Sequence, residues 1–225
     1  KSKKLTTDKI APLVLLRRGG KWPGKNAVLV ESIRACLVIA AFGAYVQSFR
    51  TIQFSQAATF YSFAPIMSVG LAVVFLKERL SAWGTGALLL GFVGVLVALN
   101  PQVKPAVGAY FALGTGVLYG CYLFLNRVVA VRWNPVMALF LQFWIGSILL
   151  TPLVWNDLTP SMVAHLPMFG AIAAVSVVCN LLLINAYRLA PANFLAPFLY
   201  VEIPSALLIA AVFFEEKLGW NIILG

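Results

Sequence analysis

Long apolar runs dominate the hydrophobic pattern of this chain. A helix needs about 20 mostly apolar residues to cross the hydrocarbon core of a bilayer. We expect such helices at residues 27–48, 53–76, 83–100, 105–126, 134–155, 166–187 and 192–214. The runs are apolar on every face, whereas a membrane-spanning β-strand alternates apolar and polar positions. The pattern therefore predicts an all-α fold, a polytopic membrane helix bundle.

Shorter apolar segments lie near both ends of the chain. GWNIILG, 219–225, would cover only about 10 Å as a helix, a third of the bilayer core. IAPLVLL, near the start, is likewise too short to cross. We therefore expect about seven full helices plus fragments, in a chain that looks truncated at its C-terminus.

Composition and charge exclude two other classes of protein. With 61% hydrophobic and 11% charged residues, the chain has too little polar surface for a soluble domain. The net charge of +10 does not indicate nucleic-acid binding, because eight of the 17 Lys and Arg lie in the first 25 residues and most others flank apolar runs. If the N-terminal segment is cytoplasmic, only Arg50, Lys104 and Lys217 face outside. This bias predicts the orientation of the bundle.

Two segments of the chain resemble each other. SFAPIMSVGLAVVFLKERL, 62–80, is similar to VEIPSALLIAAVFFEEKL, 201–218. Several aligned positions lie 138 residues apart, whereas Pro65 and Pro204 lie 139 apart, so one copy carries a single-residue slip. An odd number of predicted spans separates the copies, which inverts the second copy in the membrane. Inverted repeats are typical of secondary transporters, whose site lies between the repeats.

The same segments carry a resemblance to a known family. APIMSVGLAVVFLKERLSAWGTGALLLGFVGVLVALNP, 64–101, resembles the end of a repeat in the EamA-like family of the drug/metabolite transporter superfamily, and 185–225 resembles its second copy. The resemblance implies a five-plus-five inverted arrangement of ten helices that moves small metabolites by alternating access. It further implies that 1–101 is an incomplete first repeat and 102–225 a second repeat with its last helix truncated.

Two prolines lie within predicted membrane helices. A helical proline leaves the carbonyl four residues earlier without its donor, and these carbonyls belong to Tyr61 for Pro65 and Tyr200 for Pro204. Paired interrupted helices indicate the binding site of a transporter. We therefore expect both tyrosines to line the pathway. The alternative is an ordinary kink whose free carbonyl bonds a neighbouring helix.

Glu202 is a carboxylate within an apolar run, near the middle of its predicted span. A charged acid at that depth costs roughly 2.5 to 3.5 kcal/mol, so it should face a cavity or stay protonated. The aligned position in the first repeat is Phe63. Three roles remain open: Glu202 holds a cationic part of the substrate, carries a coupling proton, or bonds a backbone group near Pro204.

Four further polar or aromatic residues lie inside predicted spans. Gln142 and Trp144 are two residues apart on one helix, so they point about 200° apart and should not share a cavity face. Gln56 and Asn180 lie in other spans. We include all four as candidates for binding substrate or proton, although such side chains often only bond between helices.

The sequence favours a secondary-active transporter of an amino-acid-like, flavin-like or nucleoside-derived metabolite, with proton coupling through Glu202. A non-transporting scaffold or assembly subunit is the alternative. A membrane-embedded enzyme fits less well, because its reactive motifs are missing from the sequence. We expect no catalytic residues, cofactor or metal. The expected partners are a small-molecule substrate and lipid but no nucleic acid, with a homodimer as an option. The expected location is a bacterial inner membrane, as a multi-pass protein.

Overall fold

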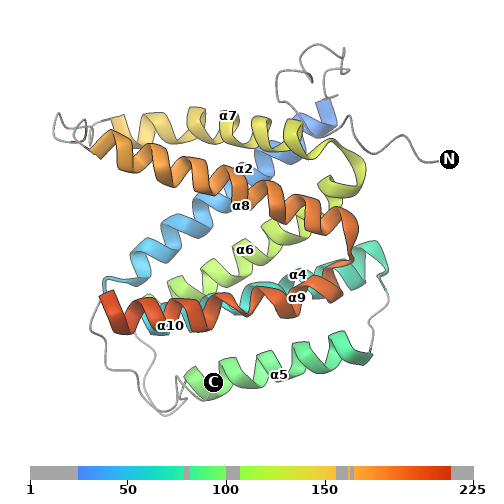
Figure 1. The fold of residues 1–225 in the computed structure, drawn as a ribbon, viewed down its shortest axis with the longest axis vertical. Coiled ribbons are helices and arrows are strands. Elements are labelled where there is room, and N and C mark those ends of the chain that lie inside the picture. The colour runs from blue at the N-terminus through green and yellow to red at the C-terminus, as the bar shows by residue number, and fades with distance from the viewer. Residues whose placement is uncertain (1–24, 79–81, 100–106, 156–161, 163–164, 214–225) are drawn as a thin grey trace, which may run out of the picture.

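The computed structural model describes residues 25–78, 82–99, 107–155, 162 and 165–213, and the predicted short segments near both ends lie outside these ranges. Within the described ranges, every long regular element is an α-helix (Figure 1). The helices are α2 (Lys25–Ser48), α3 (Phe54–Tyr61), α4 (Phe63–Leu76), α5 (Ala82–Leu99), α6 (Val107–Arg132), α7 (Pro135–Val154), α8 (Leu166–Leu189), α9 (Ala192–Leu199) and α10 (Glu202–Phe213).

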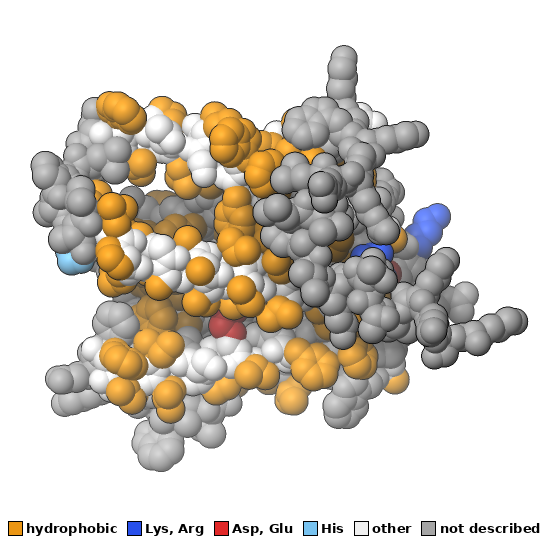
Figure 2. Space-filling model, turned by 45° about the horizontal axis from the view of Figure 1, so that its top comes forward, with side chains coloured by type: hydrophobic (Ala, Val, Ile, Leu, Met, Phe, Trp, Pro, Cys, Tyr) orange, Lys and Arg blue, Asp and Glu red, His pale blue; other side chains and the backbone are white. Residues whose placement is uncertain are grey.

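The helices confirm the predicted class of fold. Five segments in the described ranges are long and apolar enough to cross a membrane, among them α3 and α4 taken together. The predicted spans 83–100 and 192–214 correspond to α5 and to the pair α9–α10. Figure 2 shows hydrophobic side chains spread over one face of the molecule, as a lipid-facing surface requires. The chain is therefore an all-α, polytopic membrane protein.

Helix α6 lies at the centre of the bundle and packs against α2, α3, α4 and α8 (Figure 1). Two glycines allow the close approach to α3 and α4. A Cβ on Gly116 would lie 2.8 Å from the Phe60 carbonyl oxygen, and a Cβ on Gly120 would lie 2.6 Å from the Cβ of Met67. Small residues commonly bring helix backbones together in membranes. The sequence therefore places α6 directly against the point where α3 ends and α4 begins.

The proline-bearing spans are broken helices, so the irregularity that the two prolines predict takes the form of a break in each span. One residue, Ser62, separates α3 from α4, and two residues, Tyr200 and Val201, separate α9 from α10. Pro65 and Pro204 each occupy the third position of the second piece, where a helix amide has no intrahelical acceptor. The prolines are therefore accommodated in a first turn and do not distort a helix interior.

The breaks explain the single-residue slip between the repeats. Helices α3 and α9 each have eight residues and begin 138 positions apart, at residues 54 and 192. Helices α4 and α10 begin 139 positions apart, at residues 63 and 202. The extra residue of the second copy therefore lies in the break itself.

The two broken helices run antiparallel. Helix α3 packs against α10 while α4 packs against α9, so the first piece of each meets the second piece of the other. Figure 1 shows α4 next to α9 in this arrangement. An antiparallel pair is the packing that the inverted repeat predicts, and it brings the two breaks close together.

Candidate functional site

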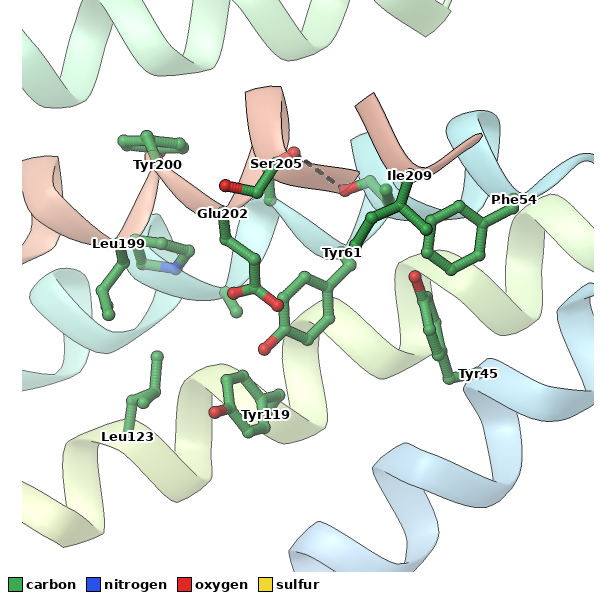
Figure 3. A pocket seen from close by; sticks show the side chains of 14 residues that line it. Tyr45, Phe54, Tyr61, Tyr119, Leu123, Leu199, Tyr200, Glu202, Ser205 and Ile209 are labelled. Carbon is green, nitrogen blue, oxygen red and sulfur yellow. Dashed lines mark hydrogen bonds between the residues drawn. The ribbon is translucent and has the colours of Figure 1, made fainter. Parts of the chain in front are cut away.

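A cavity of about 250 Å³ lies beside the two breaks (Figure 3). Helices α2, α3, α4, α6, α9 and α10 form its walls. The lining residues are Tyr45, Phe54, Ala58, Tyr61, Ser62, Ala64, Pro65, Tyr119, Leu123, Leu199, Tyr200, Glu202, Ser205 and Ile209. Most of these side chains are apolar or aromatic, so a single charged group has a large influence on what this cavity can bind.

Glu202 supplies the one charged side chain among those lining residues. It is the first residue of α10, where the positive end of the helix dipole favours a carboxylate. The residue is exposed, and its carboxylate points toward Tyr61 (Figure 3). In Figure 2 an acidic side chain is visible in a hollow of the otherwise apolar surface. Glu202 therefore faces a cavity, as expected for a carboxylate in an apolar span, and the start of α10 stabilises its negative charge.

Three tyrosines lie on one side of this carboxylate. The ring centroids of Tyr45 and Tyr61 are 5.8 Å apart, and those of Tyr61 and Tyr119 are 5.0 Å apart. We call Tyr45, Tyr61 and Tyr119 the tyrosine wall. The aromatic residues inside the predicted spans, Tyr61 and Tyr119 among them, already suggested a flat or amphipathic substrate, whereas Tyr45 lies on a helix that only the fold brings here.

Tyr200 lines the cavity, but its ring lies away from the tyrosine wall. A Cβ on Gly91 of α5 would come within 2.6 Å of the Tyr200 ring, so the ring packs closely on that glycine. Figure 3 shows the ring on the far side of the α9–α10 backbone from Tyr61. The Tyr200 hydroxyl is buried and has no hydrogen-bond partner among the described residues. The two predicted tyrosines therefore have different surroundings.

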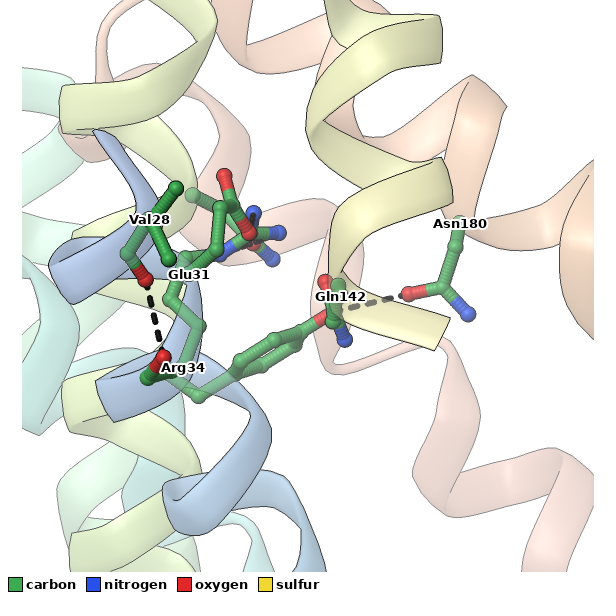
Figure 4. A network of polar contacts seen from close by, with 8 residues as sticks. Val28, Glu31, Arg34, Gln142 and Asn180 are labelled. Atoms are coloured by element: carbon green, nitrogen blue, oxygen red, sulfur yellow. Dashed lines mark hydrogen bonds and ion pairs between the residues drawn. The ribbon is translucent and has the colours of Figure 1, made fainter. Parts of the chain in front are cut away.

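Gln142 and Asn180 lie in a separate polar network (Figure 4). The Tyr122 hydroxyl donates to Asn180 Oδ1 at 2.9 Å and accepts from Gln142 Nε2 at 3.2 Å. The rings of Tyr122 and Tyr119 stack with centroids 5.4 Å apart. The structure thus places these two candidates behind the tyrosine wall and not among the residues that line the cavity.

A fully buried ion pair adjoins this network. Arg34 donates to Glu31, three residues earlier on α2, and both residues are 0% exposed. Arg34 also donates to Asn126 on α6, and its guanidinium carbon lies 5.4 Å from the centre of the Tyr122 ring. A buried pair is tolerated when further hydrogen bonds satisfy it, and here the bond to Asn126 does so for Arg34, while Glu31 Oε1 has no hydrogen-bond partner among the described residues. Sequence spacing could suggest the pair but not Asn126, 92 residues away.

Trp144 and Gln56 lie outside both groups. Trp144 is 62% exposed and stacks on Phe140, whereas Gln142 is 5% exposed, so the two point apart as the helix geometry predicts. The Gln56 side chain accepts from the Gln53 amide at the start of α3. Neither Trp144 nor Gln56 is among the residues that line the cavity.

A second ion pair connects four helices, α4, α6, α8 and α9. Arg127 donates to Glu78 Oε1 at 2.7 Å and to the Tyr187 carbonyl. The amide of Ala192, the first residue of α9, donates to Glu78 Oε2 at 3.1 Å. We call Glu78, Arg127 and their bonds to Tyr187 and Ala192 the clamp. It ties α4 of one repeat to α9 of the other.

Antiparallel broken helices around an acidic cavity, in a bundle with an apolar surface, define the class of membrane transporters. Comparison with known families agrees. The chain belongs to the EamA-like transporter family, which matches residues 10–100 and again 106–225. The protein is therefore a multi-pass integral membrane protein of a transporter family, and not an enzyme.

Individual relatives carry transporter names as well. The chain is 28% identical to a protein named probable terminal-alkyne amino-acid exporter from Streptantibioticus cattleyicolor, over 71% of the chain and 56% of the relative. It is 27% identical to an S-adenosylmethionine uptake transporter of Rickettsia bellii, over 71% of the chain and 55% of the relative. The chain thus spans just over half the length of these two relatives. Their bacterial sources agree with the expected inner membrane.

Proposed function

We propose that this chain belongs to a secondary-active transporter that moves a small metabolite by alternating access, with Glu202 as the group that binds substrate or proton. One observation carries the proposal: the cavity's single carboxylate lies where two antiparallel broken helices meet. Sites of this kind, at the interface of inverted repeats, are where secondary transporters bind their substrates. The division of the chain into repeats at residues 101 and 102 stays a prediction.

The position of the cavity supports an outward-facing state. Its lining includes Tyr45 near the end of α2 and Phe54 at the start of α3, a region that the charge bias places toward the outer side. The clamp lies at the other end, beside the predicted inner residues Lys77 and Arg188. Alternating access would then require α4 and α9 to separate at the clamp.

The single carboxylate, Glu202, suggests how substrate transport is coupled to proton movement. A carboxylate in apolar surroundings binds either a proton or a cationic group, because an unpaired charge there is costly. A substrate cation and a proton would therefore compete for Glu202, which gives proton-coupled exchange.

The relatives' names favour amino-acid-like or nucleoside-derived substrates that carry an amine, and a flavin-like substrate is the third class that the sequence suggested. Lipid contacts, the absence of nucleic acid and a homodimer stay predictions.

Flux through proteoliposomes tests the proposal. The complete protein would be reconstituted and supplied with radiolabelled S-adenosylmethionine and a panel of amino acids. Glu202→Gln removes the charge with little change in shape, so we expect flux of the transported compound to fall to background. Ser205→Ala is the matched control: it alters the same cavity, but its hydroxyl only bonds the Val201 carbonyl of its own helix. We expect this variant to retain flux.

Unchanged flux and unchanged pH dependence in the folded Glu202→Gln variant would reject the site. A wild-type protein that moves none of the panel, and whose thermal midpoint none of them raises, would favour the alternative of a non-transporting scaffold or assembly subunit.

A further inference from the structure

Two exposed cations flank the clamp. Lys77 directly follows α4, and Arg188 lies in the last turn of α8. Each is exposed, and neither forms an ion pair with another described residue. Arg127 donates to Glu78, the residue after Lys77, and the same guanidinium donates to the carbonyl of Tyr187, the residue before Arg188. Two positive charges from different helices are therefore held close together at the predicted inner end of the bundle.

The clamp does not supply counter-ions for these two cations. Its one acidic side chain, Glu78, already pairs with Arg127 at 2.7 Å. The helices α6, α7, α8 and α9 contain no aspartate or glutamate. The described part of the chain thus leaves Lys77 and Arg188 as a positively charged surface that an anion from outside the protein can neutralise.

Exposed apolar side chains continue from the cations along the same helices. Leu189, beside Arg188, is 87% exposed, and Leu182 on α8 is 66% exposed. Phe75, two residues before Lys77, is 67% exposed. In a membrane such apolar side chains contact acyl chains, while long cationic side chains at helix ends reach the headgroups. The surface therefore offers contacts for both parts of a phospholipid.

We propose that Lys77 and Arg188 form a binding site for the headgroup phosphate of an anionic phospholipid in the inner leaflet. An arginine binds a phosphate through two parallel hydrogen bonds, and a lysine adds a compact point charge. The charge bias places both residues on the cytoplasmic side, where the leaflet is negatively charged and basic pockets between helices bind anionic headgroups. The site is separate from the Glu202 cavity and does not depend on the proposed function.

A role as topology signals requires only that Lys and Arg be present in the inner loops. It does not require two cations from different helices to lie together, without counter-ions, above an exposed apolar surface. A headgroup held by both residues would bridge α4 and α8, so a bound lipid should stabilise the folded protein.

Lipid binding to the complete protein, purified without lipid in a neutral detergent, tests this site. Phosphatidylglycerol is the anionic probe, phosphatidylcholine with the same acyl chains is the zwitterionic control, and glycerol 1-phosphate supplies the phosphate without acyl chains. We expect phosphatidylglycerol to raise the thermal midpoint until the site is saturated, because it binds the folded state. The other two compounds should change the midpoint little.

Charge variants locate the site. Lys77→Gln and Arg188→Gln should each weaken phosphatidylglycerol about fivefold, the ratio that about 1 kcal/mol per basic residue produces, and the double variant should weaken it further. Arg50→Gln is the matched control, because Arg50 is exposed but lies between α2 and α3, away from the clamp. We expect this variant to bind phosphatidylglycerol as the wild-type protein does.

The possible outcomes are distinct. Equal stabilisation by phosphatidylcholine or by glycerol 1-phosphate would overturn the proposal of an anionic-lipid site. An equal loss of affinity in Arg50→Gln would also overturn it, because any exposed cation would then attract the lipid. Selectivity for phosphatidylglycerol that falls in the Lys77 and Arg188 variants alone would support it.

Discussion

Gly120 shows how one residue controls the distance between α6 and α4. A Cβ at this position would lie 2.6 Å from the Met67 Cβ and 2.8 Å from the Ala64 carbonyl oxygen, closer than real atoms approach. The helix would have to move away from the break between α3 and α4, which forms part of the cavity. Gly114, on the same helix, has nothing within 4 Å of an added Cβ.

We therefore predict that Gly120→Ala destabilises the protein while Gly114→Ala does not. Alanine is intrinsically better than glycine in a helix by about 0.5–1 kcal/mol, so Gly114→Ala should keep or raise the thermal midpoint. Overpacking costs about 1–3 kcal/mol and should outweigh that gain at Gly120. Thermal unfolding of both variants in the same detergent measures the difference. Equal midpoints would mean that α6 does not depend on this close contact.

The sequence identified some site residues and missed others for one physical reason. Glu202 is conspicuous in the sequence because a single charge in an apolar run is costly wherever the helix packs. Tyr45 has no such local signal, since aromatic residues are common in membrane helices. Arg34 and Asn126 meet only because α2 packs on α6. Contacts of this kind depend on which helix faces adjoin, and spacing along one chain does not contain that information.

At the scale of the elements, the clamp connects helices that alternating access must separate. Glu78 accepts from both Arg127 and the Ala192 amide, so removing its charge weakens two bonds at once. Hydrogen bonds to charged groups contribute about 1.5–3 kcal/mol each. Glu78→Gln keeps an acceptor for the amide but loses the ion pair. We predict that this variant opens the end of the bundle where α4 meets α8 and α9.

Distances between spin labels on Lys77 and Leu189 would measure that opening. Both residues are exposed, at the end of α4 and the end of α8 respectively. The wild-type protein should give one narrow distribution, and Glu78→Gln should add a longer distance. Arg188→Gln is the control, because it removes an exposed charge at the same end without touching the clamp. Identical distributions in all three proteins would contradict a gating role for Glu78.

The predicted spans correspond closely to the helices, but the exact position of the break within two of them could not be predicted. The length and hydrophobicity of an apolar run determine where a chain crosses the bilayer, so the spans could be predicted from the hydrophobic pattern alone. Pro65 and Pro204 indicated an irregularity but not its form. Whether a proline kinks a helix or begins a new one depends on whether neighbouring helices admit the free backbone groups. Here Gly116 provides the space beside the first break.

At the scale of the whole molecule, the structure separates two polar regions inside an apolar bundle. The Glu202 cavity is accessible, whereas Glu31 and Arg34 are sealed and paired. The stacked rings of Tyr119 and Tyr122 lie between the two regions. The three described carboxylates therefore differ in accessibility: Glu202 is open, Glu31 is buried, and Glu78 is held by Arg127.

Labelling of carboxylates with dicyclohexylcarbodiimide tests the central claim most directly, because the reagent attacks protonated carboxyl groups in apolar surroundings. Mass spectrometry would quantify the adduct at Glu202, Glu31 and Glu78 of the complete protein, with and without a saturating concentration of the transported substrate. We predict that Glu202 reacts first, that flux falls in proportion, and that substrate protects it while labelling at the other two stays low. Labelling of Glu202 that saturating substrate does not slow would contradict the account.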